Sequence, residues 1–240
     1  MMMILVVGGT GTLGRLLVRS LIACGDTVRV LTRSTTVADA LAEQGAEPVI
    51  GDLRDADTVR RAVAGCAAVV AAASGFGPMG SSTPTSVDCG GNLTLIGEAA
   101  KAGVGRFVFV SVRGAAPDAR LELARMKYAA EQALSSSAMM WTIVRPSPFL
   151  ETYLAIVGQP MARRNTTLVF GNGAAVVNFV SVRDVAALVG KALRDPALAG
   201  KTVEWGGANF TLNDLSTAIH KAAGRPGPTS HVPIGMLRAA

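Results

Sequence analysis

A glycine-rich turn near the start of the chain carries the clearest chemical signal in the sequence. It follows the apolar stretch Met3–Val7 and consists of Gly8-Gly9-Thr10-Gly11-Thr12-Leu13-Gly14. Gly9, Gly11 and Gly14 fit the spacing G-x-G-x-x-G, and Gly8 with the last two fits G-x-x-G-x-x-G, so the first glycine stays open. Such a turn lets a pyrophosphate approach backbone N–H groups at the positive end of a helix. An ordinary turn without a ligand is the alternative.

The elements around the turn favour the first interpretation. A buried-type strand precedes it, an amphipathic helix begins at Leu13, and a second strand is expected at 27–32. This is the β-α-β unit that dinucleotide-binding turns require. The sequence therefore predicts a dinucleotide site.

The residue after the second strand indicates which dinucleotide binds. An acidic side chain there accepts a hydrogen bond from a ribose 2′-hydroxyl, whereas an arginine accommodates a 2′-phosphate. The chain has Arg33, with Arg15 and Arg29 as candidate helpers, and no acidic residue until Asp39. We expect NADP(H) rather than NAD(H), the alternative being that Arg33 is a solvated loop charge.

The remaining sequence continues the alternation of strands and helices. Strands are expected at 47–50, 67–73, 106–110, 141–145 and 201–205, and helices at 37–44, 55–64, 87–102, 120–134, 181–193 and 211–223. Two short strands around Gly171-Asn172-Gly173 have a hairpin signal. The pattern predicts an α/β fold with a doubly wound parallel sheet. Residues 1–150 are expected to form the Rossmann core, and 151–240 a small, interleaved C-terminal part that covers the substrate cleft.

Ligands of such sheets bind at the carboxyl ends of the strands. Asp52 and Leu53 follow the third strand, and Ala72, Ala73 and Ser74 end the fourth, so these residues are expected to line the adenine and ribose side. Asp52 could equally be a turn residue. Residues 74–86, rich in Gly, Ser, Thr and Pro, are expected to form a loop over this site.

Composition excludes several other classes of protein. The net charge is +6, but the basic residues are scattered and only 5% of residues are aromatic, which argues against direct nucleic-acid binding. The three cysteines lack disulfide or metal spacing, and His220 and His231 are expected to be surface or packing residues. No apolar run has membrane-spanning length, and no signal peptide is evident. We expect a cytoplasmic protein that binds neither metal nor membrane.

Several motifs together carry a resemblance to a known family. They are Gly8-Gly-Thr-Gly-Thr-Leu-Gly14, Val30-Leu-Thr-Arg33, Gly51-Asp-Leu53, Phe107-Val-Phe-Val-Ser111, Lys127 to Leu134, Thr142-Ile-Val-Arg-Pro146 and Asn178-Phe-Val-Ser-Val-Arg-Asp-Val185. The chain resembles the atypical short-chain dehydrogenase/reductases, in particular the NmrA-like NAD(P)-binding group with its isoflavone-reductase-like relatives. The resemblance implies an extended Rossmann fold that binds NADP(H), with a small substrate-binding part.

The resemblance also implies catalytic roles, with one departure. Ordinary members carry a Ser and a Tyr-x-x-x-Lys pair; Ser111 and Lys127 match, but Leu123 stands where the Tyr belongs. Tyr128 follows the Lys directly and points to another part of the helix. The isoflavone-reductase-like relatives imply that Lys127 binds the cofactor and donates the proton. The alternatives are a surface Lys127 paired with Glu131, and a Ser111 that bonds its own turn.

The sequence thus yields one set of candidate site residues. Lys127 and Ser111 are the catalytic candidates, while Pro146 and Ser147 are expected either to border the nicotinamide, as in relatives, or to form a structural kink. The predicted cofactor-binding residues are Gly8, Gly9, Thr10, Gly11, Thr12, Leu13, Gly14, Arg33, Asp52, Leu53, Ala72, Ala73, Ser74, Lys127, Pro146 and Ser147.

The leading hypothesis is an NADP(H)-dependent oxidoreductase that reduces a small carbonyl, quinone or enone-type compound. The alternative is a non-catalytic NADP(H)-binding redox sensor, regulator or assembly factor; a homodimer or a protein partner stays open. Residues 237–240 resemble the start of a helix, whereas relatives usually continue further. Either the chain is truncated or its cleft is unusually open.

Overall fold

The computed structural model describes residues 1–75 and 83–233. It divides the chain into two compact units, each described by itself. The first unit consists of Met1–Pro146 with Arg183–Trp205, and the second of Ser147–Val182 with Gly206–Ala240. Residues 76–82 of the predicted loop and the predicted helix start at 237–240 lie outside the described residues.

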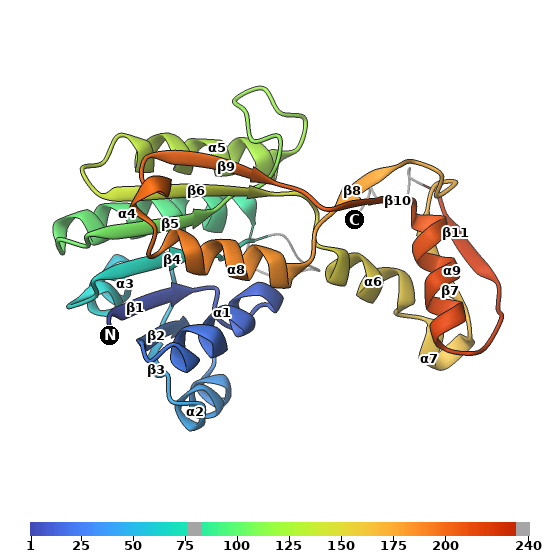
Figure 1. Ribbon diagram of the computed structural model, residues 1–240, viewed down its shortest axis with the longest axis horizontal. Helices are drawn as coiled ribbons and strands as arrows, with labels where there is room; N and C mark the ends of the chain where they lie inside the picture. The colour runs from blue at the N-terminus through green and yellow to red at the C-terminus, as the bar shows by residue number, and fades with distance from the viewer. Residues whose placement is uncertain (76–82, 234–240) are drawn as a thin grey trace. The chain divides into compact units, whose positions relative to one another are not determined.

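The first unit is built on a seven-stranded sheet (Figure 1). The strands are β1 (Met3–Val7), β2 (Thr27–Thr32), β3 (Glu47–Ile50), β4 (Ala68–Ala71), β5 (Arg106–Val110), β6 (Met140–Pro146) and β9 (Lys201–Trp205). Their order is β3-β2-β1-β4-β5-β6-β9, and every neighbouring pair is parallel. The order reverses between β1 and β4, which opens a crevice at their carboxyl ends. The predicted fold class is confirmed.

Helices cover both faces of this sheet. They are α1 (Thr12–Ala23), α2 (Thr35–Glu43), α3 (Ala56–Val63), η1 (Pro84–Gly91), α4 (Asn92–Lys101), α5 (Glu122–Ser135), α8 (Val182–Ala192) and η2 (Pro196–Leu198). Helices α3, α4 and α5 pack side by side against one face, and α1 and α8 lie over the other (Figure 1). The core of the α3–α5 face is apolar and includes Leu5, Val69, Phe107 and Phe109. Buried strands and amphipathic helices thus hold the strand ends rigidly.

The helix predicted at 87–102 is two elements. A π-helix, η1, begins at Pro84 because the Thr83 side chain accepts a hydrogen bond from the backbone N–H of Ser86, and the Ser86 hydroxyl accepts one from the backbone N–H of Thr83. Proline fits this first position, since its missing N–H would have no helical partner. The α-helix α4 starts only at Asn92. The predicted loop at 74–86 therefore ends earlier than expected. Asp88 lies within η1.

The second unit contains two small sheets rather than the predicted hairpin. Its elements are α6 (Leu150–Gly158), α7 (Met161–Arg164), β7 (Thr167–Phe170), β8 (Val177–Phe179), β10 (Ala208–Phe210), α9 (Leu212–Ala222) and β11 (Thr229–Val232). Strand β7 pairs in parallel with β11, and β8 pairs antiparallel with β10. The hairpin prediction is wrong because both strands find partners from beyond residue 206. The turn at Gly173, with a φ of +68°, packs instead against Asn213 of α9.

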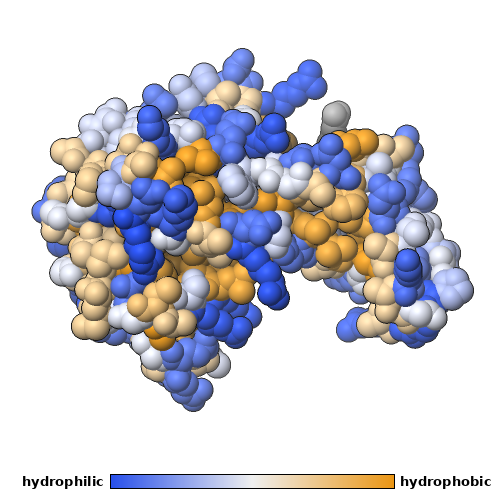
Figure 2. Space-filling model, in the orientation of Figure 1, coloured by the Kyte–Doolittle hydropathy of each residue, from blue (hydrophilic) through white to orange (hydrophobic). Residues whose placement is uncertain are grey.

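Hydrophilic and apolar residues are interspersed over the face of each unit shown in Figure 2. Among residues 1–75 and 83–233, the structure contains no helix that is both long enough and apolar enough to span a bilayer.

Candidate functional site

The glycines of the turn after β1 serve two different needs. A Cβ on Gly14 would lie 2.0 Å from the carbonyl oxygen of Gly8, and one on Gly9 would lie 2.6 Å from Val30. Gly8 has a φ of +87°, and a Cβ on it would lie 2.6 Å from the backbone nitrogen of Ala73. Packing therefore requires these three glycines, whichever one is counted as the first of the motif. A Cβ on Gly11 would meet Gly8 only at an ordinary 3.5 Å, so its missing side chain leaves space on the exposed side of the turn.

Helix α1 presents an N-terminus suited to an anion. Its N-cap is Gly11, which supplies no side-chain capping bond, and its first turn holds no acidic residue. The first backbone N–H groups of a helix lack intrahelical partners and carry the positive end of its dipole. A phosphate that reaches Gly11 would meet these groups directly.

A hollow of about 500 Å³ lies beside the turn. It is lined by Thr10, Thr32, Arg33, Ser34, Val37, Asp52 and Arg54. Asp52 forms a bidentate ion pair with Arg54, whose Nε and Nη2 atoms lie 2.9 and 2.7 Å from the carboxylate oxygens. Hydrogen bonding by Arg54 lowers the pKa of Asp52 to about 2, and the charge of Arg33 acts in the same direction. Asp52 also accepts a bond from the backbone N–H of Arg54, so it is both a turn residue and part of the hollow.

The two candidate helpers of Arg33, Arg15 and Arg29, bind different parts of the structure. Arg15 donates to the carbonyl oxygen of Thr10 at 2.8 Å, next to the turn. Arg29 donates instead to the carbonyl oxygens of Ala62 and Ala64 and pairs with Glu47. The suggestion that Arg29 helps Arg33 is therefore wrong, because its side chain caps the end of α3.

Lys127 is buried at the carboxyl ends of β4 and β5. Its Nζ donates to the carbonyl oxygens of Ala73 at 2.9 Å and Val110 at 3.1 Å, and lies 3.0 Å from Oδ1 of Asp88. The ring of Phe109 completes the surroundings, with its centroid 4.9 Å from Nζ. Burial lowers the pKa of Lys127, and the nearby Asp88 carboxylate opposes this shift.

The alternative of a surface Lys127 paired with Glu131 is wrong. Only 2% of Lys127 is exposed, and the Glu131 carboxylate is bound instead by Arg145 at 3.0 and 2.6 Å. Two of the three oxygen neighbours of the ammonium accept hydrogen bonds from it, and the third, Oδ1 of Asp88, forms an ion pair with it. To donate a proton to a substrate, the Lys127 Nζ would have to give up its contact with one of these three oxygens.

Ser111 stands next to this cluster with an unused hydroxyl. The residue is 2% exposed, and its backbone N–H donates to the carbonyl oxygen of Val144. Its Oγ has no hydrogen-bond partner among the described residues. The idea that Ser111 bonds its own turn is therefore wrong. A buried hydroxyl without a partner costs about 1–3 kcal/mol, which a ligand that hydrogen-bonds to it would offset.

The other predicted residues are distributed over several places. Ala72 and Ala73 follow β4 and contact the Gly8 backbone, and Ser74 lies 3.4 Å from Oδ2 of Asp88. Leu53 is part of the apolar core rather than of the hollow. Pro146 ends β6 in the first unit, whereas Ser147 belongs to the second unit, where its Oγ donates to Asn178 at 2.9 Å.

Sequence reasoning missed Arg54 and Asp88. Asp88 is fully buried, and its Oδ2 accepts a hydrogen bond from the backbone N–H of Gly75 at 2.7 Å. The available signal was a lone acidic residue in the small and apolar stretch 87–93. Arg54 follows Asp52 by two residues, a spacing at which an Asp commonly bonds the local backbone.

These residues fit a dinucleotide cofactor. The space at Gly11 and the N-terminus of α1 suit a pyrophosphate, and the hollow at Arg33 suits the adenosine end. The Ser111 hydroxyl, at the carboxyl end of β5 and without a partner in the described part of the chain, suits the reacting end. A doubly wound parallel sheet with this turn at its switch point defines a dinucleotide-binding protein of the Rossmann type.

The chain belongs to the NAD(P)H-binding family, which it matches over residues 8–196. It is an NAD(P)-binding protein of the short-chain dehydrogenase/reductase kind, as the sequence resemblance implied. The chain is 31% identical to the photosystem II assembly factor Ycf39 of Synechocystis sp., covering 99% of this chain and 72% of that protein. It is also 31% identical to an NAD(P)H azoreductase of Xenophilus azovorans, covering 93% and 75%.

Solved structures share the fold. The triphenylmethane reductase of Citrobacter sp., solved as a complex with NADP(H), superposes with a TM-score of 0.77 at 20% identity. The match covers 99% of this chain and 83% of that one. The family and its relatives place the chain among NAD(P)-dependent oxidoreductases, a family that also contains assembly factors.

Proposed function

We propose that the protein is an NADP(H)-dependent reductase of a small conjugated acceptor, of the quinone or enone type. The observation that carries the proposal is the buried hydroxyl of Ser111, which lies at the carboxyl end of β5 beside the Lys127 cluster and has no hydrogen-bond partner within residues 1–75 and 83–233. When bound, the reduced nicotinamide would supply a hydride. Ser111 would donate a hydrogen bond to the acceptor oxygen, and Lys127 would hold the ends of β4 and β5 in place.

The choice of acceptor follows from what the helix α5 lacks. Leu123 occupies the position of the tyrosine that protonates simple carbonyls in ordinary relatives, and the Lys127 ammonium already has three oxygen neighbours. Reduction of a simple carbonyl requires a proton as the hydride arrives. A quinone or enone spreads the charge of the added hydride over its conjugated system, so that water can supply the proton. The azoreductase relative reduces another conjugated acceptor, and azo compounds therefore belong in the same screen.

The preference for NADP(H) is supported by Arg33 in the hollow at the end of β2. The test is a calorimetric titration with NADPH, NADP⁺, NADH and NAD⁺ side by side, followed by turnover assays with quinones, enones and azo compounds. We expect NADPH to bind at least about tenfold more tightly than NADH. Equal affinity for both would refute the preference, and no binding of either would refute the reductase.

A second function has two observations in its favour. Relatives named as assembly factors match 99% of this chain, and Leu123 removes the usual acid. On this alternative, the protein binds NADP(H) and acts through a protein partner. Binding without turnover on any acceptor of the screen would favour it, whereas turnover that disappears in Ser111→Ala would favour the reductase.

A further inference from the structure

The hollow beside the phosphate turn contains two arginines from two different loops. Arg33 follows β2, Arg54 follows β3, and both line the hollow. The two strands are parallel neighbours with Thr32 opposite Ile50, so their carboxyl ends, and the loops that follow, lie side by side. Arg54 thus reaches the same space as Arg33 from the neighbouring strand.

We propose that Arg54 is a second residue that selects the 2′-phosphate of NADP(H), and that Asp52 positions it. The inference rests on the proposed NADP(H) function and deepens it. Asp52 holds the guanidinium through Nε and Nη2 at 2.9 and 2.7 Å, which fixes the plane of the Arg54 side chain at the hollow. A guanidinium presents five N–H donors in a planar fork, so a single guanidinium can bind a carboxylate and a phosphate together.

The charges of the hollow support this assignment. Two arginines and one aspartate among the lining residues give a net charge of +1. Asp52, with a pKa of about 2, remains a carboxylate at any pH at which the protein would work. With Arg54 removed, the same residues would have a net charge of zero, and Arg33 would face an unpaired carboxylate. The N-terminus of α2, whose first turn holds no acidic residue, adds a weaker positive contribution.

A competing explanation is that Arg54 only neutralises Asp52 and never contacts the phosphate. The two explanations differ in the double variant Asp52→Asn with Arg54→Ala, which removes both the carboxylate and the guanidinium. If Arg54 binds the phosphate, the double variant binds it more weakly than Asp52→Asn alone. If Arg54 only shields Asp52, the double variant and Asp52→Asn bind it equally well.

The experiment isolates the adenosine end of the site. Adenosine 2′,5′-bisphosphate and adenosine 5′-monophosphate would be titrated calorimetrically into the full chain at fixed ionic strength. The variants are Arg54→Ala, Arg33→Ala, Asp52→Asn and the double variant, with Arg19→Ala as a control that removes one exposed charge from α1. The side chains of Arg54 and Asp52 are 37% and 28% exposed, so these changes leave the core intact; thermal unfolding would check this.

We expect Arg54→Ala to weaken bisphosphate binding by about ten- to a hundredfold and to leave monophosphate binding within about twofold. Arg19→Ala should change neither. Wild-type bisphosphate affinity in Arg54→Ala, or equal affinity in Asp52→Asn and the double variant, would overturn the role of Arg54 while the NADP(H) preference stands. A wild-type protein that does not distinguish the two nucleotides would overturn the NADP(H) preference itself.

Discussion

Ser111 and Lys127 lie next to each other in the site but differ in whether their polar side-chain atoms already have partners. The Ser111 hydroxyl has no partner among the described residues, whereas the Lys127 ammonium has three oxygen neighbours and an aromatic ring. Lys127 therefore holds the backbone at Ala73 and Val110, at the ends of β4 and β5. Ser111 is the group that gains most from a ligand.

Ser111→Ala should separate stability from binding. The change removes a buried hydroxyl that bonds to none of the residues the structure describes, so the free energy of unfolding without ligand should stay constant or rise by up to about 1 kcal/mol. NADPH-dependent turnover should fall at least about tenfold. Urea unfolding and turnover assays check the two effects. A loss of more than about 1 kcal/mol would show that Ser111 has a structural partner in solution.

Lys127→Met should destabilise the protein through Asp88. The Asp88 side chain is fully buried, and an uncompensated buried charge costs about 3–5 kcal/mol. The double variant Asp88→Asn with Lys127→Met removes this charge as well and should recover part of the loss. Urea unfolding of both variants measures the coupling. If the loss of stability in the double variant equals the sum of the losses in Lys127→Met and in Asp88→Asn alone, the ion pair does not stabilise the fold.

Two glycines of the phosphate turn provide a matched pair of variants. Gly14→Ala places a Cβ 2.0 Å from the Gly8 carbonyl oxygen and should destabilise the fold by about 1–3 kcal/mol. Gly11→Ala meets nothing closer than 3.5 Å, so it should change the free energy of unfolding by less than about 1 kcal/mol and still weaken NADPH binding. Thermal unfolding with calorimetric titration distinguishes them. Unchanged NADPH affinity in Gly11→Ala would show that the pyrophosphate does not approach this residue.

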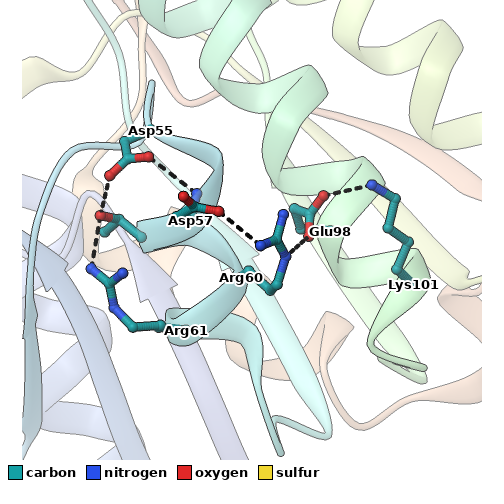
Figure 3. A network of polar contacts seen from close by, with 7 residues as sticks. Asp55, Asp57, Arg60, Arg61, Glu98 and Lys101 are labelled. Atoms are coloured by element: carbon teal, nitrogen blue, oxygen red, sulfur yellow. Dashed lines mark hydrogen bonds and ion pairs between the residues drawn. The ribbon is translucent and has the colours of Figure 1, made fainter.

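At the scale of elements, α3 and α4 are joined by a chain of charged groups (Figure 3). Arg60 of α3 pairs with Asp57 at 2.7 Å and with Glu98 of α4 at 3.1 Å, and Glu98 also pairs with Lys101 at 2.7 Å. At the start of α3, Asp55 accepts a hydrogen bond from Thr58, whose hydroxyl accepts one from Arg61. Hydrogen bonding by Lys101, followed by Arg60, lowers the pKa of Glu98. Glu98 thus links two helices that cover the same face of the sheet.

Glu98→Gln should reduce stability in a pH-dependent way. Because the folded protein lowers the pKa of Glu98 from its usual 4.5, the carboxylate contributes stability above pH 4.5 and loses it as the pH falls through the lowered value. The variant should unfold at a lower temperature than the wild type at pH 7, and the difference should shrink below pH 4.5. Thermal unfolding at several pH values measures it. A difference that does not change with pH would contradict the role of the charge.

The segment around β9, at the edge of the sheet, is held by contacts from β6 and from β5. The Thr142 hydroxyl donates to the Leu198 carbonyl oxygen, and the backbone N–H of Gly200 donates to Trp141, each at 2.7 Å. The buried Arg106 guanidinium donates to the carbonyl oxygens of Ala192 and Asp195, at the end of α8. These contacts join Arg183–Trp205 to Met1–Pro146, the other segment of the first unit.

At the scale of the whole molecule, all the residues assigned to the phosphate turn, the hollow and the Lys127 cluster lie in the first unit. They come from segments far apart in the sequence that meet at the carboxyl ends of parallel strands. The second unit, with its two small sheets, contributes Ser147 among the predicted residues.

Hydrogen exchange can test this arrangement in one measurement. NADPH should slow amide exchange in residues 8–14, 32–37, 52–54 and 72–75, because a bound ligand suppresses opening of the segments that hold it. Mass spectrometry with and without NADPH, and with NADH as a control, would locate the protected segments. Protection limited to the second unit would contradict the assignment of the site.

The sequence alone determined the features that depend on neighbouring residues. Alternation and turn signals predicted the strands β2, β3, β5 and β9 with their observed bounds, and the glycine spacing located the turn between β1 and α1. The aspartate before α3 predicted its cap, which the structure shows as a bond from the backbone N–H of Asp57 to Asp55. These patterns are readable because hydrogen bonds and side-chain periodicity within one element are local.

Only the tertiary structure decided which distant residues meet. The pairing of Lys127 with Asp88 rather than Glu131, and of β7 with β11 rather than β8, joins segments that no local pattern relates. Arg29 and Arg54 have the same charge, yet one caps α3 and the other enters the hollow. Burial, strand order and the direction of each side chain settle these contacts, and all three arise only when the elements pack together.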